Sequence, residues 1–373
     1  MAALPGRTDV VVVGGGIAGV AAAYFLAVAG RDVLLIEREP QLALHTTGRS
    51  AAIYLAHYGG PANQRLTVAS RAFLSDPPAG LCDHPVLTAR PFVMFAPPGE
   101  EATIDELHDE VSRLAEVERL DRAATLALAP YLRPEAVGAA FLEPGAQDID
   151  VTGLHQGFVR GARAAGAVIA RSAGLVGLVR VGDDTWTVTT DRGSVGCAVV
   201  VDAAGPWGDE VARMAGAAPV GLVPMRRTAC TVTVPPVPPE GPMVATVGPG
   251  FYAKPESGGL MLVSPADETP SDPCDARPEE IDVARALDAM DAATTLGARH
   301  VTRAWAGLRT FAPDRDPVIG WDDAVPGFCW MVGQGGTGIQ TAPAAGRLLA
   351  DIVTKTVRSE LGPERLRVSS SCR

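Results

Sequence analysis

The stretch Asp9-Val-Val-Val-Val-Gly14-Gly-Gly16-Ile-Ala-Gly19-Val-Ala-Ala-Ala23 decides the fold of this chain. Its run of valines predicts a buried parallel strand, and the apolar residues from Ile17 to Ala29 predict a helix. A Gly-x-Gly-x-x-Gly pattern joins the two. In such a turn Gly14 permits the tight reversal, Gly16 lets backbone amides approach a pyrophosphate, and Gly19 lets the helix pack closely on the strand.

The residues that follow agree with this interpretation. The segment Asp32–Glu37 predicts a neighbouring strand that ends in a carboxylate suited to the hydroxyls of a ribose. The N-terminus of the helix between the strands presents free N–H groups and a positive dipole to phosphates. Strand, glycine turn, helix and acid together predict a dinucleotide-binding unit. The alternative is a glycine-rich turn that opens an ordinary helix.

Composition places the chain among globular proteins with room for two domains. It has 373 residues, 47% of them hydrophobic and 20% charged, and a net charge of −11. The negative charge argues against nucleic acid and anionic membranes as partners. No apolar run has the length of a transmembrane helix, and Met1–Thr8 lacks the architecture of a signal peptide. We therefore expect a cytoplasmic protein.

The cysteines and histidines predict neither disulfides nor a metal site. The six cysteines include no Cys-x-x-Cys pair, which favours reduced thiols. The six histidines show no metal-ligand spacing with them.

The remaining segments can be assigned by pattern, and none repeats another. Residues 216–309 combine β-favouring segments with many prolines and aromatics, which predicts a separate sheet that covers the cofactor. The charged segment 100–129 has the pattern of two solvated amphipathic helices. Further helices are predicted at 62–75, 154–165 and 342–353, and strands at 92–96, 168–170, 175–181, 185–190 and 198–202.

These segments predict a discontinuous architecture. We expect a Rossmann-like α/β domain for the cofactor and an interleaved α+β domain, with an antiparallel sheet, for the substrate. A simple NAD dehydrogenase usually keeps its nucleotide domain contiguous. The predicted boundaries are 1–80, 141–215 and 310–357 for the first domain, 81–140 and 216–309 for the second, and 358–373 for a flexible tail.

Several motifs, spread over the chain up to about residue 355, resemble the glycine-oxidase and D-amino-acid-oxidase group of FAD flavoproteins. Within that group the resemblance is greatest to D-arginine-type D-amino-acid dehydrogenases. The motifs are Gly14–Glu37, Thr47-Gly-Arg-Ser-Ala-Ala52 with Tyr58-Gly59, Asp148-Ile-Asp150 with Leu154-His-Gln-Gly157, Ala203-Ala-Gly-Pro-Trp207, Pro224-Met-Arg-Arg227, Phe251-Tyr-Ala-Lys-Pro255, Trp305-Ala-Gly-Leu-Arg-Thr-Phe311 and Gln334-Gly-Gly-Thr-Gly-Ile-Gln340.

The resemblance implies FAD as the cofactor. Non-covalent attachment is predicted because Arg309–Gly320 lacks the cysteine to which sarcosine-oxidase relatives attach their flavin. The implied cofactor contacts are Gly14, Gly16, Ile17, Ala18, Gly19, Glu37, Arg38, Thr47, Gly48, Arg49, Ser50, Ala51, Ala52, Leu175, Ala204, Gly205, Trp207, Arg309, Gly335, Gly336, Thr337, Gly338, Ile339 and Gln340.

The reaction implied by the resemblance, amine oxidation next to a carboxylate, needs an anion clamp. Arg309 lies in an apolar segment, and a guanidinium binds a carboxylate through two charge-assisted bonds. The alternative for Arg309 is a structural ion pair. Arg227 is the expected second arginine, while Arg226 faces the other way if the segment is a strand. Tyr252 can add a phenol hydrogen bond; the alternative is core packing.

Amine oxidation requires two more groups in the site, one for the amine proton and one for the charge on the flavin. The amine must lose a proton before hydride leaves the α-carbon for flavin N5, and Tyr58 is the candidate that positions the amine or a water. We expect the adjacent His57 to face away and to be structural. Backbone amides at Gly335–Gln340 can stabilise negative charge on the flavin, the alternative being a turn that caps the following helix.

Two departures from the D-arginine-type pattern concern the substrate pocket. Those enzymes carry an acid after the Arg-Pro that is Arg90-Pro91 here, but this chain has Phe92. They place a histidine after Ser-Ala-Ala, where this chain has Ile53. Both changes make the pocket less polar, so we predict an apolar or bulky D-amino acid, or an imino acid, rather than a basic one. The predicted pocket residues are Ile53, Phe92, Met243 and Gln340.

Three functions remain open on the sequence. The favoured one is FAD-dependent oxidative deamination of a D-amino acid, with an imine product that water hydrolyses to a 2-oxo acid and ammonia. The second is a specialised amine or imino-acid oxidase that reduces oxygen to peroxide. The third, a non-catalytic flavoprotein, is disfavoured because Arg227 and Arg309 both occur in apolar contexts. The electron acceptor can be a quinone, an electron-transfer protein or oxygen; Lys254 is a candidate for oxygen activation, but a dehydrogenase is favoured.

Overall fold

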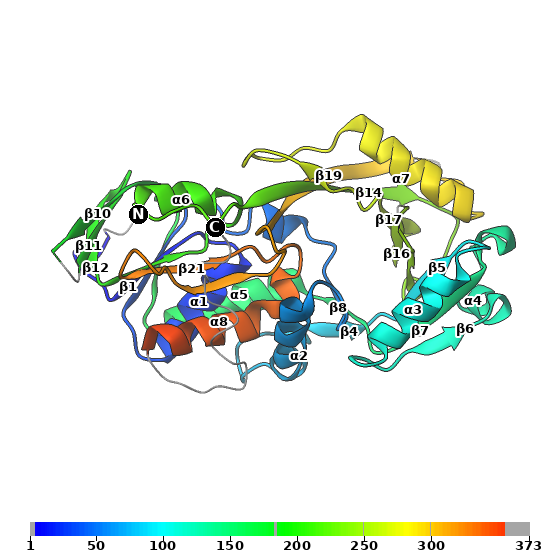
Figure 1. The fold of residues 1–373 in the computed structure, drawn as a ribbon, viewed down its shortest axis with the longest axis horizontal. Coiled ribbons are helices and arrows are strands. Elements are labelled where there is room, and N and C mark those ends of the chain that lie inside the picture. The colour runs from blue at the N-terminus through cyan, green and yellow to red at the C-terminus, as the bar shows by residue number, and fades with distance from the viewer. Residues whose placement is uncertain (1–3, 183–184, 249, 299, 355–373) are drawn as a thin grey trace.

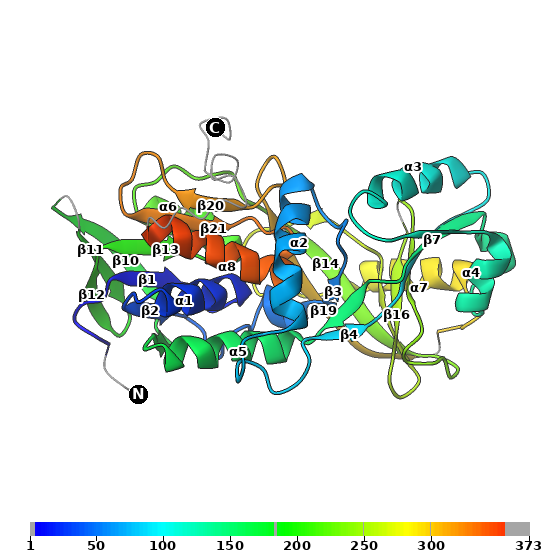
Figure 2. The same cartoon turned by 90° about the horizontal axis from the view of Figure 1, so that it is seen from below.

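The computed structural model describes residues 4–182, 185–248, 250–298 and 300–354. It is an elongated molecule with a six-stranded sheet at one end and a nine-stranded sheet at the other (Figure 1). Helices cover the first sheet on one face, and the second sheet carries its own helices (Figure 2). The chain passes between the two ends several times.

The six-stranded sheet contains the glycine motif. Its order is β20-β21-β13-β1-β2-β9, parallel except for the edge strand β20. Both faces are covered, which is why β1 is a continuous run of buried valines. The strands are β1 (Val10–Val13), β2 (Val33–Ile36), β9 (Val168–Ala170), β13 (Val199–Asp202), β20 (Val318–Trp321) and β21 (Phe328–Val332).

Two layers enclose this sheet. On one face lie four helices, α1 (Ile17–Val28), α2 (Pro61–Ser75), α5 (Val151–Ala164) and α8 (Gly338–Thr354), which share one apolar core with the sheet. The other face packs on a three-stranded antiparallel sheet and a short helix. These elements are β10 (Leu175–Val181), β11 (Thr185–Thr190), β12 (Gly193–Cys197) and α6 (Gly208–Met214).

The nine-stranded sheet has the order β18-β14-β17-β16-β15-β5-β7-β6, and β19 pairs with β14. Helix α7 (Glu280–Ala293) packs on one face, and α3 (Glu101–Val111) packs near the β5–β7 end. The strands are β5 (Phe92–Ala96), β6 (Glu118–Leu120), β7 (Ala139–Glu143), β14 (Val223–Thr233), β15 (Met243–Thr246), β16 (Tyr252–Glu256), β17 (Leu260–Ser264), β18 (Thr269–Pro270) and β19 (His300–Phe311).

Smaller elements connect the two ends. A short antiparallel sheet has the order β3-β8-β4. Its strands are β3 (Ile53–Tyr54), β4 (Leu87–Ala89) and β8 (Gln147–Ile149). Helix α4 (Arg122–Leu128) and the 3-10 turn η2 (Pro134–Ala136) pack at the end of the nine-stranded sheet. The other 3-10 turns are η1 (Thr46–Arg49) and η3 (Gly205–Trp207).

The predicted fold class is confirmed, with two departures in its elements. Segment 216–309 is not only a sheet, because helix α7 lies within it. Segment 100–129 is not simply a pair of helices, because β6 separates α3 from α4 and pairs with β7. Only Leu120 of that strand is buried, so its charged residues resemble a solvated helix in the sequence. The predicted tail, 358–373, lies outside the described residues, and the domain boundaries stay a prediction. No helix among the described residues is long and apolar enough to cross a membrane.

Candidate cofactor and substrate site

The glycine turn between β1 and α1 is built as the motif predicts. Gly14 has a φ of +111°, and a Cβ on it would lie 2.5 Å from the carbonyl oxygen of Ala203. A Cβ on Gly19 would lie 1.8 Å from the Gly14 oxygen, so only glycine permits α1 to pack this closely. A Cβ on Gly16 would approach the Thr47 hydroxyl at 3.3 Å. The turn leaves the start of α1 open toward a cavity.

Glu37 holds this turn as well as lining the cavity. Its carboxylate accepts hydrogen bonds from the Gly15 amide at 2.7 Å and from the Glu39 amide at 2.9 Å. The predicted ribose acid therefore lies beside the glycine turn, at the carboxyl end of β2, where an open α/β sheet binds its ligands.

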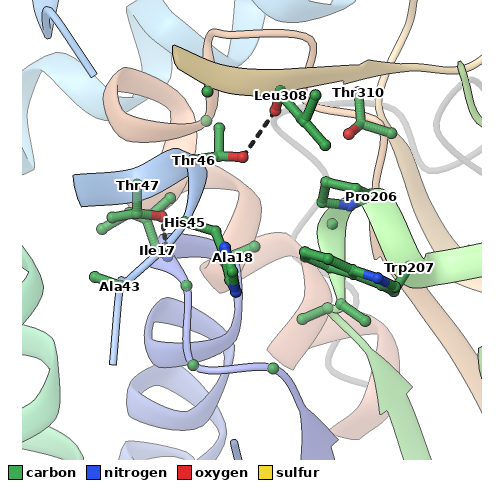
Figure 3. A pocket seen from close by; sticks show the side chains of 18 of the residues that line it. Ile17, Ala18, Ala43, His45, Thr46, Thr47, Pro206, Trp207, Leu308 and Thr310 are labelled. Atoms are coloured by element: carbon green, nitrogen blue, oxygen red, sulfur yellow. Dashed lines mark hydrogen bonds between the residues drawn. The ribbon is translucent and has the colours of Figure 1, made fainter. Parts of the chain in front are cut away.

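The cavity extends from this turn to the arginine-bearing strands of the nine-stranded sheet. Figure 3 shows part of its wall, in which Thr46 and Thr47 face Pro206 and Trp207 across the opening. Twenty-one predicted site residues line it: Gly14, Gly16, Ile17, Ala18, Glu37, Arg38, Thr47, Arg49, Ser50, Ala51, Leu175, Ala204, Gly205, Trp207, Arg227, Tyr252, Arg309, Gly335, Gly336, Gly338 and Ile339.

Nine predicted site residues lie outside this lining. Gly19 and Gly48 lie in the turns behind it, and Gln340 is buried, accepting a hydrogen bond from the Leu55 amide at 3.0 Å and donating one to the Thr67 hydroxyl at 2.9 Å. The complete set is Gly19, Gly48, Ala52, Ile53, Tyr58, Phe92, Met243, Thr337 and Gln340.

One end of the cavity has flat side chains. The guanidinium of Arg38 lies 3.8 Å from the ring centroid of Trp207, and the ring of His45 lies 5.0 Å from it. Glu39 binds His45 Nε2 at 3.0 Å. Aromatic and guanidinium planes of this kind suit the stacking of an adenine ring. The sequence reasoning missed His45, although its position in the small, polar loop after Glu37 was a signal.

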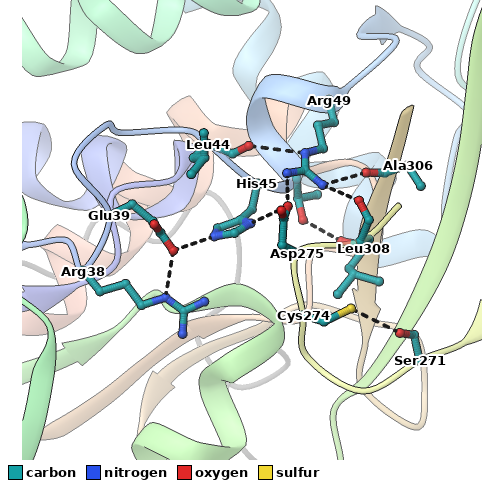
Figure 4. A network of polar contacts seen from close by, with 12 residues as sticks. Arg38, Glu39, Leu44, His45, Arg49, Ser271, Cys274, Asp275, Ala306 and Leu308 are labelled. Atoms are coloured by element: carbon teal, nitrogen blue, oxygen red, sulfur yellow. Dashed lines mark hydrogen bonds and ion pairs between the residues drawn. The ribbon is translucent and has the colours of Figure 1, made fainter. Parts of the chain in front are cut away.

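Arg49 ties the η1 turn to β19. Its guanidinium donates to the carbonyl oxygens of Ala276 at 2.7 Å and Ala306 at 3.0 Å and forms an ion pair with Asp275 (Figure 4). The Thr46 hydroxyl donates to the Leu308 carbonyl at 2.8 Å. The charge of Arg49 is therefore engaged within the protein, while its side chain lines the cavity.

Polar groups around the cavity fit a dinucleotide that carries a flavin. Among the described residues, the lining residue Thr310 has a buried hydroxyl without a hydrogen-bond partner, whereas His45 Nδ1 lies 3.8 Å from the carboxylate of Asp275. The 17-residue helix α8 begins at the lining residue Gly338, and the preceding Gly336 has a φ of +98°. The start of α1 can therefore hold the phosphates, and the start of α8 can hold a ring that gains negative charge.

At the other end of the cavity, Arg227 of β14 and Arg309 of β19 lie on neighbouring strands. Arg309 donates a hydrogen bond to the Tyr58 hydroxyl and has no acidic partner among the residues that the structure describes. Arg227 donates to the carbonyl oxygen of Asp267 at 2.6 Å and pairs with Glu268 at 3.2 Å. Arg226 pairs with Glu279 and Asp282 at α7, on the opposite face as predicted.

The two arginines change the chemistry of Tyr58. Burial alone would raise the pKa of this phenol, but the charges of Arg309 and Arg227 and the hydrogen bond from Arg309 outweigh it. The pKa of Tyr58 therefore lies below its usual value of 10. Tyr58 is thus a group that can hold or accept a proton beside a cation.

Apolar residues gather behind Tyr58. Ile53, Phe92 and Met243, three of the four predicted pocket residues, share one apolar cluster with Tyr58 and Tyr252. His57 bonds instead to the buried carboxylate of Glu143 at 2.7 Å. Lys254 pairs with Asp148 at 3.0 Å and with Glu256 at 3.1 Å, outside the cavity lining.

Comparison with known proteins gives the family. A family model described as "DAO: FAD dependent oxidoreductase" matches residues 9–352. Mitochondrial dimethylglycine dehydrogenase of Mus musculus is 27% identical over 380 residues, which is 92% of this chain and 42% of that protein. The chain therefore spans less than half the length of that relative. Glycine oxidase of Pseudomonas aeruginosa is 30% identical over 198 residues, 48% of each chain.

Solved structures share the fold. Glycine oxidase from Geobacillus kaustophilus superposes with a TM-score of 0.85 at 23% identity, covering 98% of this chain and all of that one. L-proline dehydrogenase from P. horikoshii gives a TM-score of 0.83 at 22% identity, covering 94% of each chain. The family match spans the glycine turn, both sheets and both arginines. This chain therefore belongs to the DAO family of FAD-dependent oxidoreductases, and its cofactor is FAD.

Proposed function

We propose that this chain oxidises an amine at a carbon that bears a carboxylate, with an apolar D-amino acid as the predicted substrate. The observation that carries the proposal is Arg309, a cation without an acidic partner among the described residues, placed beside Tyr58 at the end of the cofactor cavity. Dimethylglycine dehydrogenase and glycine oxidase, the relatives named above, are both named for amines that carry a carboxylate.

Arg309 would hold the substrate carboxylate. Its guanidinium has donors beyond the one that binds Tyr58, and a carboxylate can accept two of them in parallel. Arg227 lines the same cavity and adds positive charge, and Tyr252 can add a phenol hydrogen bond. A substrate held in this way has its α-carbon fixed relative to the turn at Gly335–Gly338.

Tyr58 would accept a proton from the substrate amine. An ammonium group cannot release an electron pair, so one proton must leave before the C–H bond breaks. The lowered pKa of Tyr58 makes its phenolate accessible near neutral pH more often than for an ordinary tyrosine. Bound FAD supplies the acceptor for the two electrons of the C–H bond. The imine product would hydrolyse in water without a further catalytic group.

The side-chain preference follows from the cluster behind Tyr58. Phe92 is only 2% exposed and Met243 only 6%, and the buried carboxylate of Glu143, opposite Phe92 on β7, is already bonded to His57 at 2.7 Å. A cationic side chain would lose its hydration there and would have to compete with His57 for Glu143. We therefore expect D-leucine, D-phenylalanine or D-proline to be preferred over D-arginine.

A tertiary amine is the second candidate. The observation that favours it is the match to dimethylglycine dehydrogenase over 92% of this chain. In that case the apolar cluster would take an N-alkyl group in place of an amino-acid side chain.

An anaerobic titration of the purified flavoprotein tests both candidates. The flavin absorbance is followed while D- and L-enantiomers of leucine, phenylalanine, proline and arginine, and N,N-dimethylglycine, are added. Bleaching by apolar D-amino acids supports the first candidate, and bleaching by dimethylglycine alone supports the second. A preference for D-arginine or for L-enantiomers would contradict the substrate prediction. Readmitting air then shows whether oxygen or another acceptor takes the electrons.

A further inference from the structure

We infer that Glu268 is a specificity residue, which limits the site to substrates with one carboxylate by neutralising the charge of Arg227. This inference rests on the proposed function. It concerns a difference between the two cavity arginines: Arg309 has no acidic partner among the described residues, whereas Arg227 already has one. A substrate with a second carboxylate would have to compete with Glu268 for Arg227.

Glu268 is held in place from two sides. It pairs with Arg227 at 3.2 Å and with Arg315 at 2.9 Å. The preceding residue, Asp267, accepts hydrogen bonds from the Thr228 amide at 2.7 Å and the Thr228 hydroxyl at 3.1 Å. These bonds fix the loop after β17 to β14, so Glu268 stays next to Arg227 without relying on the ion pair alone.

The Arg315 side chain also has a second contact that holds it in place. Its guanidinium lies 3.8 Å from the ring centroid of Phe311, and a Cβ on Gly335 would lie 2.4 Å from that ring. The two ion pairs from Arg227 through Glu268 to Arg315 thus end beside Phe311, whose ring packs against the turn before α8. If Glu268 moved away, Arg227 and Arg315 would both lose the ion pair that the structure gives them.

The charge of Glu268 also acts on the rest of the site. It raises the pKa of Tyr58, against the larger effects of Arg309 and Arg227, which places it within electrostatic range of the substrate end. Removing this single negative charge would release the Arg227 nitrogen that binds Glu268 for a second anion, while the bond to the Asp267 carbonyl remains. Because the Arg227 side chain is only 11% exposed, the change should be felt more strongly there than at a fully exposed cation.

The test uses two non-oxidisable probes of similar shape. Methylthioacetate carries one carboxylate and thiodiacetate carries two, and binding of each to the FAD-loaded protein is measured from the change in flavin absorbance. In Glu268→Gln, we expect the affinity for thiodiacetate to rise about tenfold relative to that for methylthioacetate. Glu268→Asp, which keeps the charge, should keep the wild-type ratio. Flavin content and thermal unfolding establish that each variant is folded.

Glu256→Gln is the matched control. Glu256 also pairs with a buried cation, Lys254, at 3.1 Å, and its side chain is 37% exposed against 32% for Glu268. Glu256→Gln should leave the affinities for both probes within twofold of the wild-type values. An unchanged ratio in Glu268→Gln, with both probes still bound, would overturn this inference and leave the proposed function intact. Failure of the wild-type flavoprotein to bind either probe would overturn both this inference and the proposed function.

Discussion

Arg309 donates a hydrogen bond to the hydroxyl of Tyr58 across 251 positions of sequence. The strand β19 supplies the cation, and the segment after β3 supplies the phenol. Each group changes the other, because the guanidinium lowers the pKa of the phenol while the phenol occupies one of its donors. The two residues form the link between the cofactor cavity and the apolar cluster of Phe92 and Met243.

Replacing Arg309 by lysine should weaken substrate binding while keeping the positive charge. Lysine cannot form two parallel bonds to a carboxylate, and a charge-assisted hydrogen bond contributes about 1.5–3 kcal/mol. We expect the dissociation constant for methylthioacetate to rise by about tenfold to a hundredfold. Arg303→Lys, on the exposed part of β19, is the control and should change nothing. Equal affinities in Arg309→Lys and the wild type would contradict the clamp.

Tyr58→Phe should remove one step from the pH dependence of flavin reduction. In the wild type the phenol loses its proton below the usual value of 10, so the rate should rise with pH through that lowered pKa and then level off. Phenylalanine cannot titrate, and any rise that remains belongs to the substrate amine. Anaerobic stopped-flow between pH 6 and 10 measures this. The control is Tyr24→Phe, a core substitution in α1, which should keep the wild-type pH profile. A pH profile in Tyr58→Phe identical to that of the wild type would refute the role of Tyr58 as proton acceptor.

The parts that the sequence predicted well are those set by local pattern. The valine run, the glycine turn and the acid at Glu37 are all within one βαβ unit, and each position is constrained by its immediate neighbours. The opposite orientations of Arg226 and Arg227 were predicted correctly because adjacent residues of a strand face opposite sides of a sheet.

The parts that escaped prediction depend on contacts between distant segments. Glu268 meets Arg227 only because β14 and the loop after β17 lie together in the sheet, and no local pattern marks it as a site residue. Gln340 was placed in the substrate pocket on a family motif, but it is buried and bonds to Thr67 of α2 and to Leu55 after β3. The ladder partner of β6 likewise lies in β7, which follows α4.

Gly19→Ala should abolish FAD retention. The new methyl group would lie 1.8 Å from the Gly14 oxygen, so α1 must move away from the turn that holds the phosphates. We expect a loss of about 3 kcal/mol or more in the free energy of unfolding, as for other severe backbone clashes. The ratio of flavin to protein absorbance and a urea titration measure the two effects. Gly177→Ala, where no atom lies within 4 Å of the new Cβ, is the control.

Asp202→Asn should stabilise the protein at neutral and alkaline pH. Asp202 is fully buried at the end of β13, and burial raises its pKa to about 8, while the hydrogen bond from the Ala204 amide lowers it only partly. Its second carboxylate oxygen has no hydrogen-bond partner among the described residues. The folded protein therefore keeps a proton that the unfolded chain releases near pH 4.

The sign of the pH effect follows from this difference in bound protons. Between about pH 4 and pH 8 the unfolded state binds fewer protons than the folded state, so the wild type loses stability as pH rises, by at most about 1.4 kcal/mol per pH unit from this group. Asparagine carries no such proton and can still accept the Ala204 amide. The stabilisation by Asp202→Asn should therefore grow from pH 5 to pH 8 in urea titrations. The exposed Asp288→Asn should give no trend, and a stabilisation independent of pH would show that Asp202 is not protonated in the fold.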